Sequence, residues 1–203
     1  MSLSMSAPRD VRRLAPAILC AVAVAACSNT IPRHPAVYVP PPVTAAPSAV
    51  DMTGWVTLNP DGEGFSVSMP GTAQKTTDSI QTPGGEGSES VWNCADSSGV
   101  GYMVVRVQLK PGSLTGAPVK DVLDTSVTQE ASLIPDAKIV SQLDVTLSGH
   151  PGRRVTVANS TTTGVGELFI ASDDIYFVGV VGDRGIIDAG RTEAFFASFQ
   201  LTV

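Results

Sequence analysis

The sequence predicts an α+β protein: an antiparallel sheet of six to seven strands flanked by helices, formed by residues 54–203. Several short segments alternate apolar and polar residues with period two, as half-buried strands do. Two longer segments instead repeat apolar residues at helical spacing. Gly and Pro are frequent, 19 and 15 of 203 residues. These residues mark turns, and the connections between the predicted strands are short. Short connections require antiparallel neighbours, because parallel strands need long crossovers.

Three strands are predicted in the first half of this domain. Phe65–Met69 alternates strictly and stops at Pro70. Residues 88–95 place Trp92 and Cys94 on one face. The third strand, Tyr102–Leu109, has apolar residues on both faces, and Arg106 and Gln108 share a face with Tyr102 and Val104.

A helix is predicted from Pro118 to about Leu133, because proline suits the first turn of a helix and Pro135 closes the segment. Its apolar stripe recurs at i, i+3, i+4 and i+8, and it consists of Val119, Val122, Leu123 and Val127.

Four further strands are predicted in a row: Lys138–Leu147, Arg153–Ala158, Gly164–Ala171 and Ile175–Val181. Their separators are His150-Pro151-Gly152, Asn159 to Thr163, and Asp173-Asp174. The last strand is apolar on both faces, which predicts a central position in the sheet with cover on both sides. A terminal helix follows over Asp188–Phe199, with Asp188 as its N-cap.

The N-terminal residues 1–26 are typical of a bacterial export signal. Three arginines precede a charge-free stretch from Leu14 to Ala26, which is too short to span a bilayer. The stretch ends in Val24-Ala25-Ala26-Cys27, which resembles the lipobox of bacterial lipoproteins. The resemblance implies cleavage before Cys27 and attachment of diacylglycerol and palmitate to it. The alternative is an ordinary secretory signal in which Cys27 has no role.

Removal of this signal leaves ten basic and eighteen acidic residues, a net charge of −8. Such a chain gains nothing from anionic head groups, so the predicted membrane attachment rests on the lipid. Residues 27–53 are rich in Pro and Ala and favour an extended tether. We therefore expect an extracytoplasmic lipoprotein, held by its lipid on the cell membrane, or on the outer membrane if two membranes exist.

The domain resembles the bacterial Mog1/PsbP-like domains in three places. These are Trp55 with the segment Gly64–Gly71, the predicted hairpin at Gly149–Gly152, and the apolar strand followed by a helix that ends in Phe195–Phe199. The resemblance implies a three-layer α/β/α sandwich. It also implies a tendency to bind other proteins but no particular activity.

Several residues could have a catalytic or binding role, but each also fits a structural role. Cys94 and His150 could form a nucleophile and its base, but Cys94 is predicted to be a core residue. The predicted structural roles are a hairpin loop for Gly84–Gly87, a solvated connection for Gly182–Gly185 with Arg184, and turns for Asp173-Asp174 and Asn159–Thr161. No metal, cofactor or nucleotide is expected, and the acidic composition argues against nucleic acid as a partner.

These observations predict a non-enzymatic, lipid-anchored binding module of the cell envelope. Its expected partner is another envelope protein, bound through an edge of the sheet or the face around the terminal helix. The alternative is a carrier or sensor of a small apolar ligand or lipid. A deep apolar pocket would favour the carrier, and a filled core with an exposed apolar patch would favour protein binding.

Overall fold

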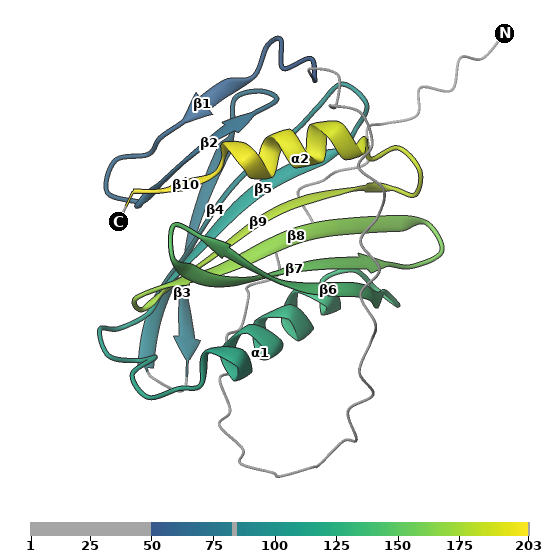
Figure 1. Ribbon diagram of the computed structural model, residues 1–203. Coiled ribbons are helices and arrows are strands. Elements are labelled where there is room, and N and C mark those ends of the chain that lie inside the picture. Colours follow the sequence, from purple (N-terminus) through teal and green to yellow (C-terminus); the bar gives the residue numbers. More distant parts are fainter. Residues whose placement is uncertain (1–49, 83–84, 203) are drawn as a thin grey trace, which may run out of the picture.

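The computed structural model describes residues 50–82 and 85–202. The predicted signal, Cys27 and the tether as far as residue 49 lie outside the described residues. Seven antiparallel strands form the main sheet in the order β3-β4-β5-β9-β8-β7-β6 (Figure 1). Their bounds are β3 Gln74–Thr82, β4 Gly85–Ala95, β5 Gly101–Gln108, β6 Lys138–Leu147, β7 His150–Ala158, β8 Thr162–Ala171 and β9 Asp174–Asp183. The predicted α+β class is confirmed.

The sheet lies between two helices. Helix α1 (Val119–Ser132) covers one face and helix α2 (Ala189–Ser198) covers the other, as Figure 1 shows. Each helix closes its own apolar cluster. Both helices were predicted. The side chain of Asp188 accepts a hydrogen bond from the backbone N–H of Arg191 at 2.7 Å, which confirms it as the N-cap of α2.

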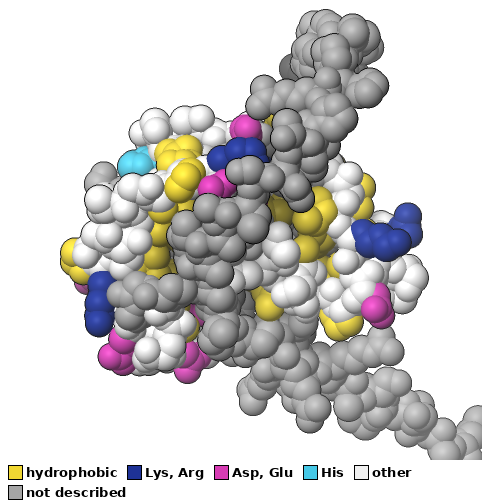
Figure 2. Space-filling model, turned by 90° about the horizontal axis from the view of Figure 1, so that it is seen from below, with side chains coloured by type: hydrophobic (Ala, Val, Ile, Leu, Met, Phe, Trp, Pro, Cys, Tyr) yellow, Lys and Arg dark blue, Asp and Glu magenta, His cyan; other side chains and the backbone are white. Residues whose placement is uncertain are grey.

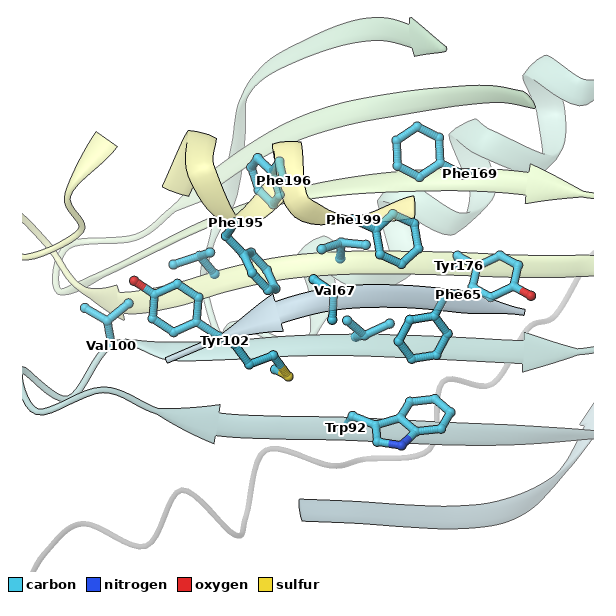
Figure 3. Packing of buried hydrophobic residues seen from close by; sticks show 14 of the residues in the cluster. Phe65, Val67, Trp92, Val100, Tyr102, Phe169, Tyr176, Phe195, Phe196 and Phe199 are labelled. Atoms are coloured by element: carbon cyan, nitrogen blue, oxygen red, sulfur yellow. The ribbon is translucent and has the colours of Figure 1, made fainter. Parts of the chain in front are cut away.

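Aromatic side chains fill the core on the α2 side of the sheet (Figure 3). Phe65 meets Trp92 edge-on with ring centroids 4.9 Å apart, and Tyr102 meets Phe195 in the same way at 5.2 Å. Such edge-to-face pairs are favourable beyond the apolar area they bury. They attach α2 and the strand that carries Phe65 to the main sheet.

Strand β9 is the central strand of the sheet, as predicted from its apolar faces. Tyr176 and Val178 are buried in the cluster on the α2 side, whereas Ile175 belongs to the cluster on the α1 side. The ring of Phe177 lies over two glycines. A Cβ atom added at Gly166 would come within 2.2 Å of this ring, and one at Gly179 within 2.5 Å. Glycine at both positions therefore makes room for the aromatic ring.

The predicted strand Phe65–Met69 exists as β2, but it is not part of the main sheet. It is the middle strand of a small antiparallel sheet with β1 (Val56–Leu58) and β10 (Gln200–Leu201). One strand of the main sheet, β3, was not predicted. Eight of its nine side chains are exposed or only partly buried, and Ile80 alone is buried, so β3 has no apolar alternation.

The turn between β6 and β7 comes earlier in the sequence than the predicted turn at residues 150–152. Its turn residues are Ser148 and Gly149, both with positive φ (51° and 86°), which suits a two-residue hairpin loop. The predicted separator His150-Pro151-Gly152 is instead the beginning of β7. A Cβ atom at Gly152 would lie 2.3 Å from the carbonyl oxygen of Leu168, so this strand position requires glycine.

Candidate functional site

Strand β6 forms one outer edge of the main sheet. It pairs with β7 on one side and is the last strand in the order, so no strand of the described part of the chain pairs with its outer side. Backbone N–H and C=O groups along such an edge can accept an added strand from another chain. All but two of its ten residues are exposed, and those two are half-buried.

Three apolar side chains of β6 face solvent. Val140 is 65% exposed, Leu143 is 64% exposed and Ile139 is 39% exposed. Helix α1 packs on β7 and β8. Leu143 is on the other face of the sheet, because it lies opposite Arg154, whose guanidinium bonds to Glu193 of α2. The register of β6 against β7 also shifts between Ile139 and Ser141, which takes Val140 out of the regular pairing. Three apolar side chains are thus exposed along the outermost strand, with Ser141 and Gln142 between them, in a segment that we call the β6 edge (residues 139–143).

The opposite edge of the sheet has a different character. Strand β3 exposes polar side chains such as Thr76, Thr77 and Ser79. Polar and charged groups on an edge strand discourage pairing with other chains. Apolar exposure is thus concentrated at β6, and the two edges are chemically distinct.

Ion pairs hold β6 in place from the α1 side. The guanidinium of Arg153 on β7 donates from Nε to Asp144 Oδ1 at 2.7 Å and from Nη1 to Gln142 Oε1 at 3.0 Å. Nη1 also reaches Asp124 on α1. Arg153 is buried, and its bonds connect side chains of β6 to β7 and α1, in addition to the backbone pairing of β6 with β7.

Figure 2 shows the molecule from below. Charged side chains form small separate groups on this face, and hydrophobic atoms reach the surface between them. The residues that the structure describes contain no group of three or more His, Cys, Asp or Glu placed to hold a metal ion. Within the same residues, no helix has the length and apolar character needed to cross a membrane.

The structure keeps Cys94 and His150 apart. Cys94 lies on β4 and His150 on β7, and three strands separate them, about 19 Å at the usual strand spacing. Burial, together with the negative charge of Asp96, raises the pKa of the Cys94 thiol to about 11. A thiol of this kind is protonated near neutral pH and is a poor nucleophile.

The two aspartates Asp173 and Asp174 have separate structural partners. Asp173 accepts hydrogen bonds from the backbone N–H groups of Gly112 (2.7 Å) and Leu114 (2.9 Å) and so fixes the loop after β5. Asp174 begins β9 and pairs with Arg106 at 2.7 Å. The predicted turn is confirmed for Asp173, whereas Asp174 belongs to the strand.

The other candidate segments also lie in connections or strands. The predicted hairpin loop Gly84–Gly87 is wrong for Gly85 and Gly87, which belong to β4 and pair with β3, and Gly84 is outside the described residues. Arg184 is exposed in the connection between β9 and α2. Asn159 closes a turn by accepting hydrogen bonds from the backbone N–H groups of Thr161 and Thr162. Cys27, the predicted lipidation site, lies outside the described residues.

Sequence reasoning did not single out two features. One is the β6 edge, and the other is a pair of buried glutamates, Glu89 and Glu130, on the α1 side of the sheet. A faint signal for the first is the adjacent pair Ile139 and Val140, which breaks the alternation of the predicted strand. A signal for the second is that Glu130 lies three residues after Val127 and hence on the apolar stripe of α1.

The seven-stranded antiparallel sheet between two helices gives the chain a PsbP-like fold. The solution structure of CyanoP, the cyanobacterial PsbP of Synechocystis sp. PCC 6803, aligns with a TM-score of 0.51 and 8% identity, over 79% of this chain and 99% of that chain. A crystal structure of PA94 from Pseudomonas aeruginosa, described as a protein of unknown function and putative regulator, aligns with a TM-score of 0.33 and 10% identity, over 64% and 83% of the two chains.

Comparisons of sequence add no relative. No family model matches the chain, and no curated protein matches it. Because the identity to CyanoP is 8%, the likeness concerns the fold alone. Function has to be argued from the surface and the interior of this chain.

Proposed function

We propose that this chain is a non-enzymatic, lipid-anchored binding module of the bacterial cell envelope, and that it engages another envelope protein through the β6 edge. The observation that carries the proposal is the edge strand with exposed Val140 and Leu143. Unpaired backbone groups supply affinity for an added strand, and the apolar side chains supply the area to be buried. The predicted export signal and Cys27 supply the anchor and the location.

The pocket beneath α1 bears on the alternative function, a carrier of an apolar ligand. This pocket is lined mainly by apolar residues of the sheet, and its inner volume of about 10 Å³ has room for about one water molecule. A lipid chain needs far more space. This pocket is therefore too small for such a ligand, and the apolar residues on an outer edge support protein binding.

The test uses the full lipidated chain in its native membrane. Leu143→Lys places a charge at the C-terminal end of the β6 edge, on an exposed side chain outside the buried core. We expect photo-crosslinking from a probe at position 140 to yield a defined partner band in the otherwise unchanged chain and to lose most of it in Leu143→Lys.

The matched control is Thr77→Lys, which adds the same charge to the opposite edge, on β3. We expect it to leave the crosslinked band unchanged. Equal bands from all three chains would show that β6 is not the binding surface. A small apolar molecule crosslinked in place of a protein would favour the carrier instead.

A further inference from the structure

Strand β6 is regular only beyond its bulge. The register shift between Ile139 and Ser141 takes Val140 out of the pairing, whereas every residue from 141 to 147 has one partner on β7. Strand β6 is also the last strand in the order of the main sheet. A strand from another chain can therefore extend the sheet most regularly over residues 141–147, which we call the regular edge.

The row of side chains that the regular edge presents on the α2 side of the sheet is mostly apolar. Leu143 lies on this side, opposite Arg154, which bonds to Glu193 of α2 at 2.8 Å. Val145 and Leu147, two and four positions further along, pack against the aromatic cluster of the same side. Leu143 itself is 64% exposed. This row therefore has apolar area left for an added strand to cover.

The row on the α1 side is polar. Asp144 lies opposite Arg153, whose Nη1 reaches Asp124 of α1. Residues opposite each other share a face of the sheet, so Asp144 lies on the α1 side. Gln142 and Thr146 share this face, because side chains alternate along a strand with period two. The regular edge is thus amphipathic, with one apolar and one polar row.

The polar row carries a negative charge at the surface. The side chain of Asp144 is 81% exposed, whereas that of Arg153 is 9% exposed. The guanidinium binds Oδ1 of the carboxylate from the protein side, at 2.7 Å. A carboxylate can accept several hydrogen bonds, so a second cation can approach Asp144 from solvent. The basic residue of β6, Lys138, lies before the bulge and outside the regular edge.

We propose that the segment bound at β6 is itself an amphipathic strand. Its apolar side chains lie on the α2 side and extend the row of Leu143, and its polar side chains lie on the α1 side, with a Lys or Arg beside Asp144. This inference rests on the proposed function, because it assumes that β6 accepts a strand. The added strand has the same period of two as β6. An apolar side chain beside Asp144 would take water from its carboxylate, and an acidic one would repel it.

Three synthetic peptides of nine residues, capped at both ends, test this on the full chain in detergent. The first alternates Val with polar residues and has Lys at its two central polar positions. The second has Glu in place of Lys, and the third has the composition of the first with its Val residues grouped together. Fluorescence anisotropy measures their affinities, with empty micelles as the blank. We expect the first peptide to bind about fivefold more tightly than the second, as an exposed ion pair allows, and more tightly than the third.

Asp144→Asn removes the charge and keeps the shape. It should bring the affinities of the Lys and Glu peptides to within about twofold of each other. Asp78→Asn is the matched control, because Asp78 is an exposed aspartate on β3, the strand at the opposite edge. It should retain the full preference for the Lys peptide. If Asp144→Asn loses its circular dichroism, 1 M salt replaces it and should remove most of the preference from the unsubstituted chain.

Equal binding of the Lys and Glu peptides, or a preference that survives in Asp144→Asn or in 1 M salt, contradicts the proposal. Tightest binding by the grouped peptide, or no binding by any of the three, also overturns it. The crosslink from position 140 separates this failure from that of the proposed function. A partner band that Leu143→Lys abolishes, without the expected peptide preference, means that β6 binds a protein segment of another pattern.

Discussion

Arg106 connects two distant parts of the chain at the level of single atoms. Its Nη1 donates to Glu63 Oε2 at 2.9 Å and to the carbonyl of Gly62 at 3.1 Å, in the loop before β2. Its Nη2 donates to Asp174 Oδ2 at 2.7 Å, at the start of β9. One buried guanidinium thus ties the small sheet to the main sheet.

Replacing Arg106 should be costly for this reason. Arg106→Met leaves Asp174 without its ion-pair partner and leaves Glu63 with Lys75 alone. We expect a loss of about 3 kcal/mol in the free energy of unfolding, the lower end of the range for a broken buried ion pair. Urea denaturation at pH 7 measures it. Arg184→Met, at an exposed arginine, is the control and should change the free energy of unfolding little.

The same ion pairs predict how stability responds to acid. Burial alone would raise the pKa of Glu63, but hydrogen bonds from Lys75 and Arg106 outweigh it and hold the pKa below the ordinary value of 4.5. Stability from a lowered carboxyl pKa is present above the unfolded value and is lost as the pH falls through the folded value. The unsubstituted chain should therefore lose stability below about pH 4.5, and Arg106→Met should lose less. The denaturant midpoint of each chain is measured between pH 3 and 7. If the midpoints of the unsubstituted chain and of Arg106→Met change in parallel with pH, the prediction is wrong.

Cys94 gives a third prediction for a single residue. Its raised pKa, about 11, means that very little thiolate exists at pH 8. The folded chain should react with a thiol reagent at Cys94 far more slowly than the chain unfolded in urea, and Cys94→Ala should retain the fold. Rapid labelling of the folded chain would revive a nucleophilic role for this residue.

Among the elements, β9 and β3 show what the sequence could and could not predict. The apolar residues on both faces of Ile175–Val181 required cover on both sides, so the central position of β9 followed from the sequence. Strand β3 is held by its backbone pairing with β4 along its whole length. Such pairing leaves no trace in side-chain chemistry, and β3 was therefore missed. Alternation identified β2 as a strand but could not say to which sheet it belongs.

The candidate site was beyond prediction for a related reason. Exposure of Val140 and Leu143 depends on the order of strands in the sheet and on the register of β6 against β7. The sequence predicted that β6 is a strand but not that it is an edge. The burial of Glu89 similarly depends on tertiary packing, because its strand pairs with β5, whose Val107 belongs to the cluster on the α1 side.

The packing of Phe177 on β9 predicts the effect of its loss. The ring is half-buried and covers Gly166 and Gly179. Phe177→Ala should cost about 3 kcal/mol, at the lower end of the range for buried phenylalanine. Denaturant unfolding measures the change. A midpoint equal to that of the unsubstituted chain would mean that the ring contributes no packing.

At the scale of the whole molecule, the predicted anchor is the decisive feature. Cys27→Ser should leave the export signal usable but prevent attachment of the lipid, because serine lacks the thiol that accepts diacylglycerol. Metabolic labelling with palmitate checks this, and equal incorporation by both chains would exclude Cys27 as the modified residue. Released from the membrane, the chain should lose most of the β6-edge crosslink, since anchoring raises its local concentration near a membrane partner.

The small sheet joins the two ends of the domain. Gln200 and Leu201 of β10 pair with Ser66 and Phe65 of β2, and the N–H of Thr202 donates to the carbonyl of Gly64 at 2.9 Å. The β2 segment is therefore made by the ribosome well before β10, and its pairing is complete only once Gln200 and Leu201 are present. The aromatic core is equally incomplete until Phe195 and Phe199 have been synthesised. A partly synthesised domain that lacks these residues therefore stays incompletely folded, because its small sheet and its aromatic core both need segments from the two ends of the domain.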